Sequence, residues 1–209
     1  MNLKSFLLQI IIIFIIGGQL SAQNNYKKTE SKFVYLTSVG FSTGVGEIKY
    51  EEKKLKNTIP IIRVHQVLAY QFNNYFTLGL GAGLDAWKNT AFIPLYLNLN
   101  VNFLDKKTTP LWHLHTGYSF KWYESQKPED GTRVIHGAKT GLYGETGLGV
   151  NIKFLQKVSF LITVNYTVQE SQLKYSVINP NEEDFSKYST NRSKNVLYHF
   201  IGIKLGILY

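Results

Sequence analysis

The chain has 209 residues, which is enough for one domain or one small barrel. It contains 23 lysine and arginine residues against 14 aspartate and glutamate residues, and this excess of positive charge would suit an anionic membrane surface or nucleic acid. The absence of cysteine excludes disulfides, thiolate zinc sites, a cysteine nucleophile and lipoprotein acylation.

The first 22 residues have the parts of a secretory signal peptide. Lys4 precedes an apolar run at 6–16, and small and polar residues follow it up to Ala22. The apolar run is too short to cross a bilayer as a helix, which takes about 20 residues. We therefore expect a signal peptide at 1–22 that is cleaved after Ala22, a flexible polar leader at 23–32 and a folded domain at 33–209.

From residue 33 onward, large apolar residues alternate with small or polar residues. This period of two predicts β-strands rather than helices. In the last strand, for example, Ile203 and Leu205 flank Lys204. The same pattern predicts eight strands, which lie in chain order at residues 33–46, 59–71, 76–85, 93–103, 112–122, 142–154, 158–169 and 195–209.

Long or polar connections mostly alternate with tight turns between the predicted strands. The long connections are 47–58, 123–137 and 171–194, the tight turns are 73–74, 105–110 and 155–157, and the connection at 88–90 is short as well. This alternation predicts an up-and-down barrel with long outer loops, and with short turns and both termini in the periplasm. In such a barrel the last strand must pair with the first, because no backbone group can remain unbonded in hydrocarbon.

The polar face of the strands indicates which side of the wall meets lipid. It consists mainly of Gly, Ser, Thr, Asn and Tyr, which suits a narrow lumen filled by side chains. The apolar face carries no Lys, Arg or Asp in the strand cores, and one Arg or Lys at the bilayer midplane would cost about 2–4 kcal/mol. We therefore expect an all-β, eight-stranded antiparallel transmembrane barrel with its apolar face outward, rather than a soluble barrel with an apolar interior.

Three segments resemble the porin-family, OmpA-like group of outer-membrane β-barrel proteins of Gram-negative, Bacteroidetes-type bacteria. They are Ile-Pro-Leu-Tyr-Leu at 93–97, Asn-Phe-Leu-Asp-Lys-Lys at 102–107 and Gly-Tyr-Ser-Phe at 117–120, and the alternating last strand with its terminal aromatic residue, Tyr209, adds to them. The resemblance covers nearly the whole chain after residue 22. It implies a location in the outer membrane, but members of this group share a barrel and not one function.

Charged residues on the polar face predict an ionic network in the lumen. A three-residue turn at 73–75 would place Arg63 directly opposite Asp85, and Lys121 and Glu145 belong to the same half of the barrel by strand position. Because an unpaired interior charge is costly, we expect these four residues to pair and to plug the barrel. The alternative is that they line a narrow ion path.

The inward-facing histidines offer a weak metal pattern. His113 and His115 share a face and could reach one metal, but the third ligand would have to be His65 or an asparagine, which is a poor ligand for transition metals. The expected register of the fourth and fifth strands instead places Asn102 opposite His113 and Asn100 opposite His115, as hydrogen-bond partners. We therefore expect no metal and no other cofactor.

Two patterns that resemble catalytic or phosphate sites have simpler explanations. Gly79, Gly81 and Gly83 recur at period two in a strand that no helix follows, so they predict lumen packing and not a phosphate loop. His199 lies on the apolar face, but it has no serine two residues away as in lipid-A-modifying barrel enzymes. We therefore expect no enzymatic activity.

The sequence thus predicts a monomeric outer-membrane protein with a structural or surface-interaction role. The alternatives are a small-solute pore or a barrel subunit of a protein-export system. After these comes a lipid-A-modifying barrel enzyme. The expected partners are outer-membrane lipid, lipopolysaccharide and a protein at the charged outer loops. Nucleic acid is not expected, because the sequence shows no basic helix or stacking platform.

Overall fold

The computed structural model describes residues 32–50, 53–87, 90–124, 134–155, 158–178 and 189–209. The expected signal peptide at 1–22 lies outside the described residues, as does all but the last residue of the expected leader at 23–32. No helix in the described part of the chain is long and apolar enough to cross a membrane.

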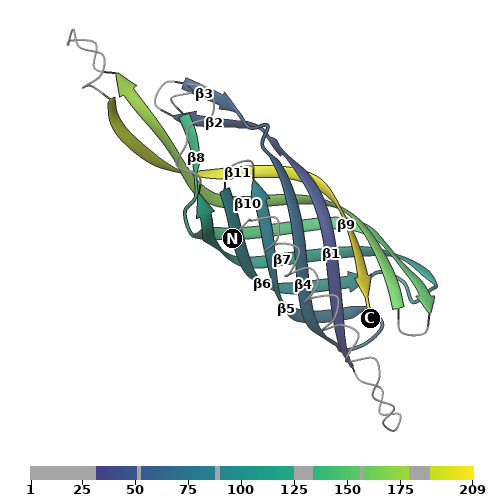
Figure 1. Cartoon of the computed structure of the whole chain (residues 1–209). Coiled ribbons are helices and arrows are strands. Elements are labelled where there is room, and N and C mark those ends of the chain that lie inside the picture. Colours follow the sequence, from purple (N-terminus) through teal and green to yellow (C-terminus); the bar gives the residue numbers. More distant parts are fainter. Residues whose placement is uncertain (1–31, 51–52, 88–89, 125–133, 156–157, 179–188) are drawn as a thin grey trace, which may run out of the picture. The chain divides into compact units, whose positions relative to one another are not determined.

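Eight long antiparallel strands form one closed sheet (Figure 1). They are β1 (Phe33–Val45), β4 (Pro60–Gln71), β5 (Phe76–Trp87), β6 (Thr90–Asn102), β7 (Thr108–Glu124), β9 (Gly141–Leu155), β10 (Val158–Ile178) and β11 (Ser189–Leu208). Each of these strands pairs with the next along the chain, and β11 also pairs with β1, from Leu208 opposite Leu36 to His199 opposite Val45. This last pairing closes the barrel, so the predicted eight-stranded up-and-down architecture is confirmed.

Three shorter strands lie in connections that the sequence pattern predicts as loops. The strands β2 (Glu47–Tyr50) and β3 (Lys53–Lys56) form a hairpin between β1 and β4, and β8 (Val134–Gly137) pairs with β10. The β10–β11 ladder also continues to the pair Ile178–Ser189, so much of segment 171–194 is hairpin and not loop. The polar composition of these segments hides their strands. They are held by backbone hydrogen bonds and by a few apolar residues, because Ile48 and Leu173 are buried in a hydrophobic cluster and Leu55 packs against it.

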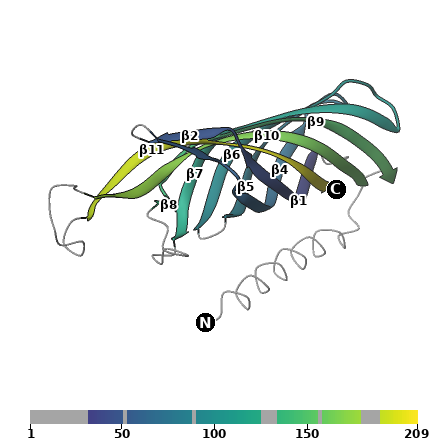
Figure 2. The same ribbon diagram turned by 90° about the horizontal axis from the view of Figure 1, so that it is seen from above.

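These additions lie at one end of the barrel. Figures 1 and 2 show β2, β8 and the extended end of β11 at the end opposite the C-terminus. At the other end are the turn between β4 and β5 and the turn between β6 and β7. In the second of these, Asp105 accepts hydrogen bonds from Lys153 Nζ at 2.7 Å and from Asn74 Nδ2 at 2.7 Å. The long connections and the short turns thus occupy opposite ends, as predicted.

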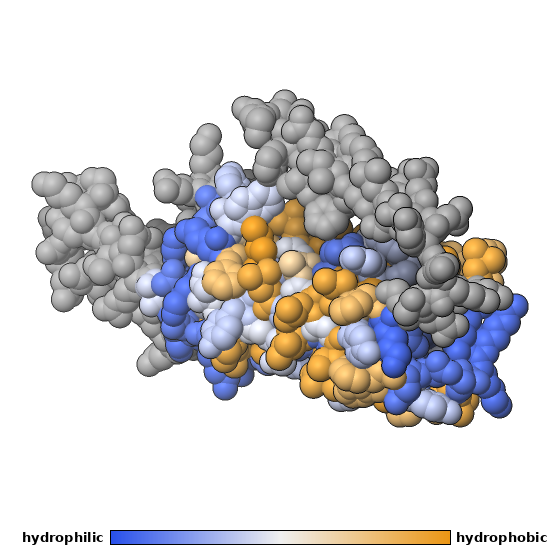
Figure 3. Space-filling model, turned by 90° about the horizontal axis from the view of Figure 1, so that it is seen from below, coloured by the Kyte–Doolittle hydropathy of each residue, from blue (hydrophilic) through white to orange (hydrophobic). Residues whose placement is uncertain are grey.

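Side chains on the eight strands alternate between an apolar exterior and an interior in which buried polar side chains lie between hydrophobic clusters. Leu80, Leu148 and Phe154 on the outer wall have exposed fractions of 68%, 63% and 65%. A whole wall of exposed large apolar side chains is unfavourable in water and favourable in lipid. In Figure 3 hydrophobic residues gather across the middle of the wall, and hydrophilic residues lie toward both ends. The apolar face therefore points outward, as the sequence predicts for a membrane barrel.

The register of β6 against β7 differs from the expected one by two residues. Asn100 lies opposite His113, and Asn98 lies opposite His115, so the expected partner Asn102 is displaced toward the turn. The turn sets this register, because the Phe103 amide donates to the Pro110 carbonyl at 3.0 Å.

Candidate functional site

Charged side chains from four strands meet inside the barrel. Arg63 and His65 lie on β4, Asp85 on β5, Glu145 on β9 and Lys204 on β11, and each occupies an inward position of its strand. Their exposed fractions are 1%, 1%, 0%, 2% and 6% in that order, so all five side chains are withdrawn from solvent. We call these five residues the lumen cluster.

Glu145 is the centre of the lumen cluster. Arg63 Nη1 donates to Glu145 Oε2 at 3.0 Å, and the hydroxyls of Tyr143 and Thr167 donate to the same oxygen at 3.1 Å and 3.2 Å. The other oxygen, Oε1, accepts from Lys204 Nζ. Both carboxylate oxygens are therefore bonded, which offsets the cost of burying this charge.

Asp85 organises the other side of the cluster. Its Oδ2 lies 3.6 Å from Arg63 Nε, in agreement with the cross-strand position of the two residues. Its Oδ1 lies 2.8 Å from His65 Nε2, while His65 Nδ1 lies 3.0 Å from the Tyr96 hydroxyl. An imidazole that donates from Nε2 to Asp85 and accepts at Nδ1 from Tyr96 satisfies both ring nitrogens, the Tyr96 hydroxyl and Asp85 Oδ1.

The formal charges of the lumen cluster cancel. Arg63 and Lys204 carry two positive charges, and Asp85 and Glu145 carry two negative charges, so the sum is zero when the imidazoles are counted as neutral. A neutral set of mutually bonded charges is the arrangement in which burial is least costly.

Three of the four residues predicted for the ionic network are in the cluster, and the fourth is not. The structure brings Arg63, Asp85 and Glu145 together, but Lys121 Nζ pairs with Glu124 at 2.6 Å, and its side chain is 44% exposed. The placement expected for Lys121 was wrong because Lys121 lies six residues farther along β7 than His115, the residue opposite Glu145, and so belongs to the outer end of the barrel.

Lys204 takes the place that the prediction gave to Lys121. Its sequence signal was its position on the polar face of the last strand. That signal could not identify its partner, because β10 separates Lys204 on β11 from Glu145 on β9, and their contact crosses the lumen.

His113, His115 and Glu145 have a geometry that could hold a metal ion. The atoms His113 Nε2 and His115 Nδ1 lie 3.3 Å and 3.2 Å from Glu145 Oε1, close to the separation of ligands that share a tetrahedral metal at about 2.0–2.2 Å. However, Lys204 Nζ already bonds the same carboxylate oxygen. A divalent ion would add charge beside Lys204 and Arg63, so these residues do not fit a metal while Lys204 is in place.

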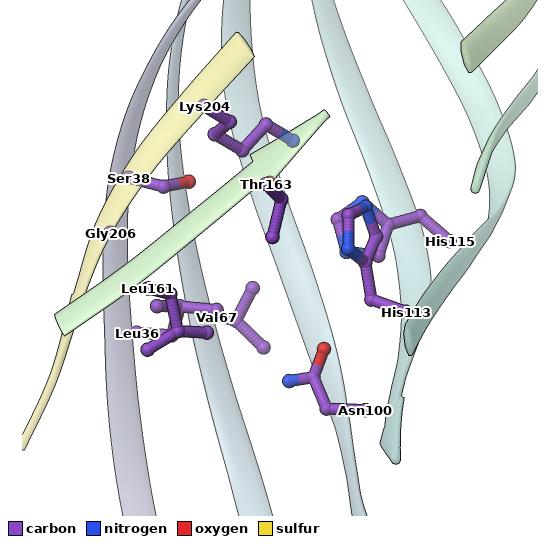
Figure 4. A pocket seen from close by; sticks show the side chains of 10 residues that line it. All are labelled: Leu36, Ser38, Val67, Asn100, His113, His115, Leu161, Thr163, Lys204 and Gly206. Carbon is purple, nitrogen blue, oxygen red and sulfur yellow. The ribbon is translucent and has the colours of Figure 1, made fainter. Parts of the chain in front are cut away.

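A small cavity lies beside the two histidines. Its volume is about 20 Å³, which is room for one water molecule. Figure 4 shows Lys204 extending from β11 toward the imidazoles, with an apolar group of side chains below it. The lining consists of Leu36, Ser38, Val67, Asn100, His113, His115, Leu161, Thr163, Lys204 and Gly206.

Above the lumen cluster, on the side of the long loops, aromatic side chains fill the barrel. The Trp87 ring centroid lies 4.6 Å from that of Phe92, 5.0 Å from that of Tyr198 and 5.1 Å from that of Phe200. All four residues are at least 95% buried, and the Arg63 guanidinium lies 5.6 Å from the Phe200 ring centroid. We call these four residues the aromatic cap; it joins the lumen cluster directly.

Glycines leave room for the largest of these lumen side chains. A Cβ atom on Gly83 would lie 2.2 Å from His65 Cδ2, and one on Gly81 would lie 2.3 Å from the Tyr96 ring. These glycines therefore serve lumen packing. In contrast, a Cβ on Gly144 would meet nothing within 4 Å among the described residues.

His199 faces outward, as its parity predicts. Its Nδ1 lies 2.7 Å from the Tyr166 hydroxyl, and the two rings stack at a centroid distance of 5.9 Å. Among the described residues, the His199 imidazole is thus paired with the Tyr166 phenol.

Comparison of the sequence with protein-family models and with curated proteins gives no match. Solved structures do match the fold. One is Neisserial surface protein A (NspA), with 9% identity, 84% of this chain and 96% of that chain covered, and a TM-score of 0.51. Another is the outer membrane protein OprG from Pseudomonas aeruginosa, with 12% identity, 84% and 96% coverage, and a TM-score of 0.50. At these identities the likeness shows the fold alone. The chain has the fold of eight-stranded outer-membrane β-barrels, in agreement with the expected location in the outer membrane.

Proposed function

We propose that this chain is a non-enzymatic outer-membrane barrel with a closed lumen, and that it acts through its outer surface in a structural or interaction role. The observation that supports this proposal is the filling of the lumen. The aromatic cap lies directly against the lumen cluster, and the cavity beside the cluster has a volume of about 20 Å³. A hydrated solute needs far more space than this.

The outer end of the barrel offers the surface for such a role. The β2–β3 hairpin carries Lys49, Lys54 and Lys56 on exposed side chains, while Glu47 pairs with Lys54 at 3.4 Å. Lys194 on the extended part of β11 reaches the Lys49 carbonyl at 3.2 Å, so this hairpin and β11 meet. Exposed ammonium groups near the lipid headgroups suit the phosphates of lipopolysaccharide or an acidic protein partner.

Single-channel recording in planar bilayers tests the closed lumen. We expect no steady conductance above a few tens of picosiemens, on the order expected for a water-filled path, while a water-filled porin inserted under the same conditions conducts. Steady openings of the purified chain would instead support the small-solute pore, provided that an antibody against the chain, or a label attached to its loops, abolishes them when it is added from one side. A misfolded sample recorded in the same way is the control for leakage through damaged bilayers.

A further inference from the structure

One amide side chain faces lipid in the middle of the wall. Gln66 lies on β4, whose bounds are Pro60–Gln71, and it shares the outward face with Val64 and Leu68. Its Oε1 accepts a hydrogen bond from Thr37 Oγ1 at 2.6 Å. No described residue accepts a hydrogen bond from its Nε2, which carries two N–H groups.

Two other polar side chains on the outward face, Trp112 and Thr146, are bonded within the barrel. Trp112 Nε1 donates to Thr146 Oγ1 at 3.0 Å, and that hydroxyl donates to the His113 carbonyl at 3.1 Å. The Gln66 Nε2 group has no such partner among the described residues, although hydrocarbon offers no acceptor for an amide.

The surroundings of Gln66 allow another protein surface to approach. Its cross-strand neighbours are Ala82 on β5 and Thr37 on β1, both small residues. Larger apolar side chains surround them, and Leu80 and Val39 are 68% and 53% exposed. Small residues next to a polar one are typical of contacts between membrane-spanning elements, because they let two backbones come close.

We propose that this face, formed by Gln66, Thr37, Ala82, Val39 and Leu80, is a contact between two copies of the chain in the membrane. A carboxamide is complementary to itself, since its N–H can donate to the oxygen of a second carboxamide while its own oxygen accepts in return. Two copies related by a two-fold axis near Gln66 would therefore satisfy both amides at once. The Gln66 oxygen keeps a second lone pair for this bond beside the one that Thr37 uses. The proposal replaces the monomer that the sequence suggests.

Crosslinking can map this contact cleanly because the chain contains no cysteine. Ala82→Cys places one thiol beside Gln66. Leu148→Cys is the matched control, because Leu148 is equally outward, 63% exposed, and lies on β9, four strands away from β4 around the closed wall. With a short bismaleimide in native outer membranes, we expect a crosslinked dimer for Ala82→Cys, and little or none for Leu148→Cys.

Sedimentation equilibrium of the detergent-solubilised full chain measures how tightly two copies bind each other. Gln66→Leu keeps the volume of the side chain and removes the amide from both copies. We expect the dimer dissociation constant to rise about tenfold, the effect of losing the two amide–amide hydrogen bonds across the contact. Heat-modifiable mobility on electrophoresis shows that each variant remains a folded barrel. A wild-type chain that sediments as a monomer at all concentrations, or equal crosslinking at positions 82 and 148, would overturn the proposal, and a crosslink to a different protein or to lipid would do the same.

Discussion

Replacing Glu145 by leucine tests whether the lumen cluster stabilises the barrel as a unit. Glu145 bonds Arg63, Lys204, Tyr143 and Thr167, so Glu145→Leu leaves two buried cations with a single carboxylate between them. The formal charge of the cluster changes from zero to +1. Removing one partner of a buried ion pair costs about 3–5 kcal/mol, and we expect a loss of unfolding free energy in this range.

The measurement is reversible urea unfolding in lipid vesicles, followed by the fluorescence of the three tryptophans. Lys121→Ala is the matched control: it removes a charge whose side chain is 44% exposed, and we expect it to change stability by less than about 1 kcal/mol. Adding Lys204→Met to Glu145→Leu restores a neutral cluster, so the double variant should lose less than the two single losses added together. Equal losses for Glu145→Leu and Lys121→Ala, or strict additivity in the double variant, would refute the reasoning.

Three further predictions follow from contacts described above. Gly83→Ala places a methyl group 2.2 Å from a buried imidazole and should destabilise the barrel by about 1–3 kcal/mol in the same assay, whereas Gly144→Ala, which meets nothing within 4 Å, should have little effect. Lys204→Met frees the carboxylate oxygen between the two histidines, so zinc should raise the melting temperature of this variant and leave that of the wild type unchanged. At the turn, hydrogen bonds from the Lys153 ammonium and the Asn74 amide lower the pKa of Asp105 below its ordinary 3.8. The stability that Asp105 contributes is therefore complete above that value and is lost as the pH falls through the lowered pKa, so Asp105→Asn should flatten the acid dependence of the urea midpoint.

Local features of the sequence were sufficient to predict those contacts of the lumen cluster whose register is set by a tight turn. The turn after β4 is short, so it fixes the register that sets Arg63 opposite Asp85. The contact between Lys204 and Glu145 depends on how three strands are registered and on the width of the lumen. The pattern of apolar residues on each strand does not contain that information.

Errors in the prediction arose where the alternation within one strand does not determine how far along the barrel two residues on different strands lie. Lys121 lies six residues beyond the position on β7 that is opposite Glu145, so it is outside the cluster. The turn before β7 shifted the expected partners of His113 by two residues. The strands β2 and β3 and the outer half of β10 are rich in charged and polar residues, so period-two hydrophobicity could not reveal them. Isolated apolar residues in them, Ile48, Leu55 and Leu173, pack into one hydrophobic cluster with the aromatic cap, and the backbone ladder supplies the rest of the pairing.

The pairing of β1 with β11 also constrains the order of folding. Neighbouring strands of the wall can form one hairpin at a time from local segments, but this seam joins positions as distant as Tyr35 and Tyr209, whose backbone groups exchange hydrogen bonds at 2.8 Å and 2.9 Å. Loop-closure entropy makes so remote a pairing slow, and until it forms, both end strands expose unsatisfied edges to their surroundings. Until the seam is complete, these two edges are the places at which a partly folded chain can pair with another chain.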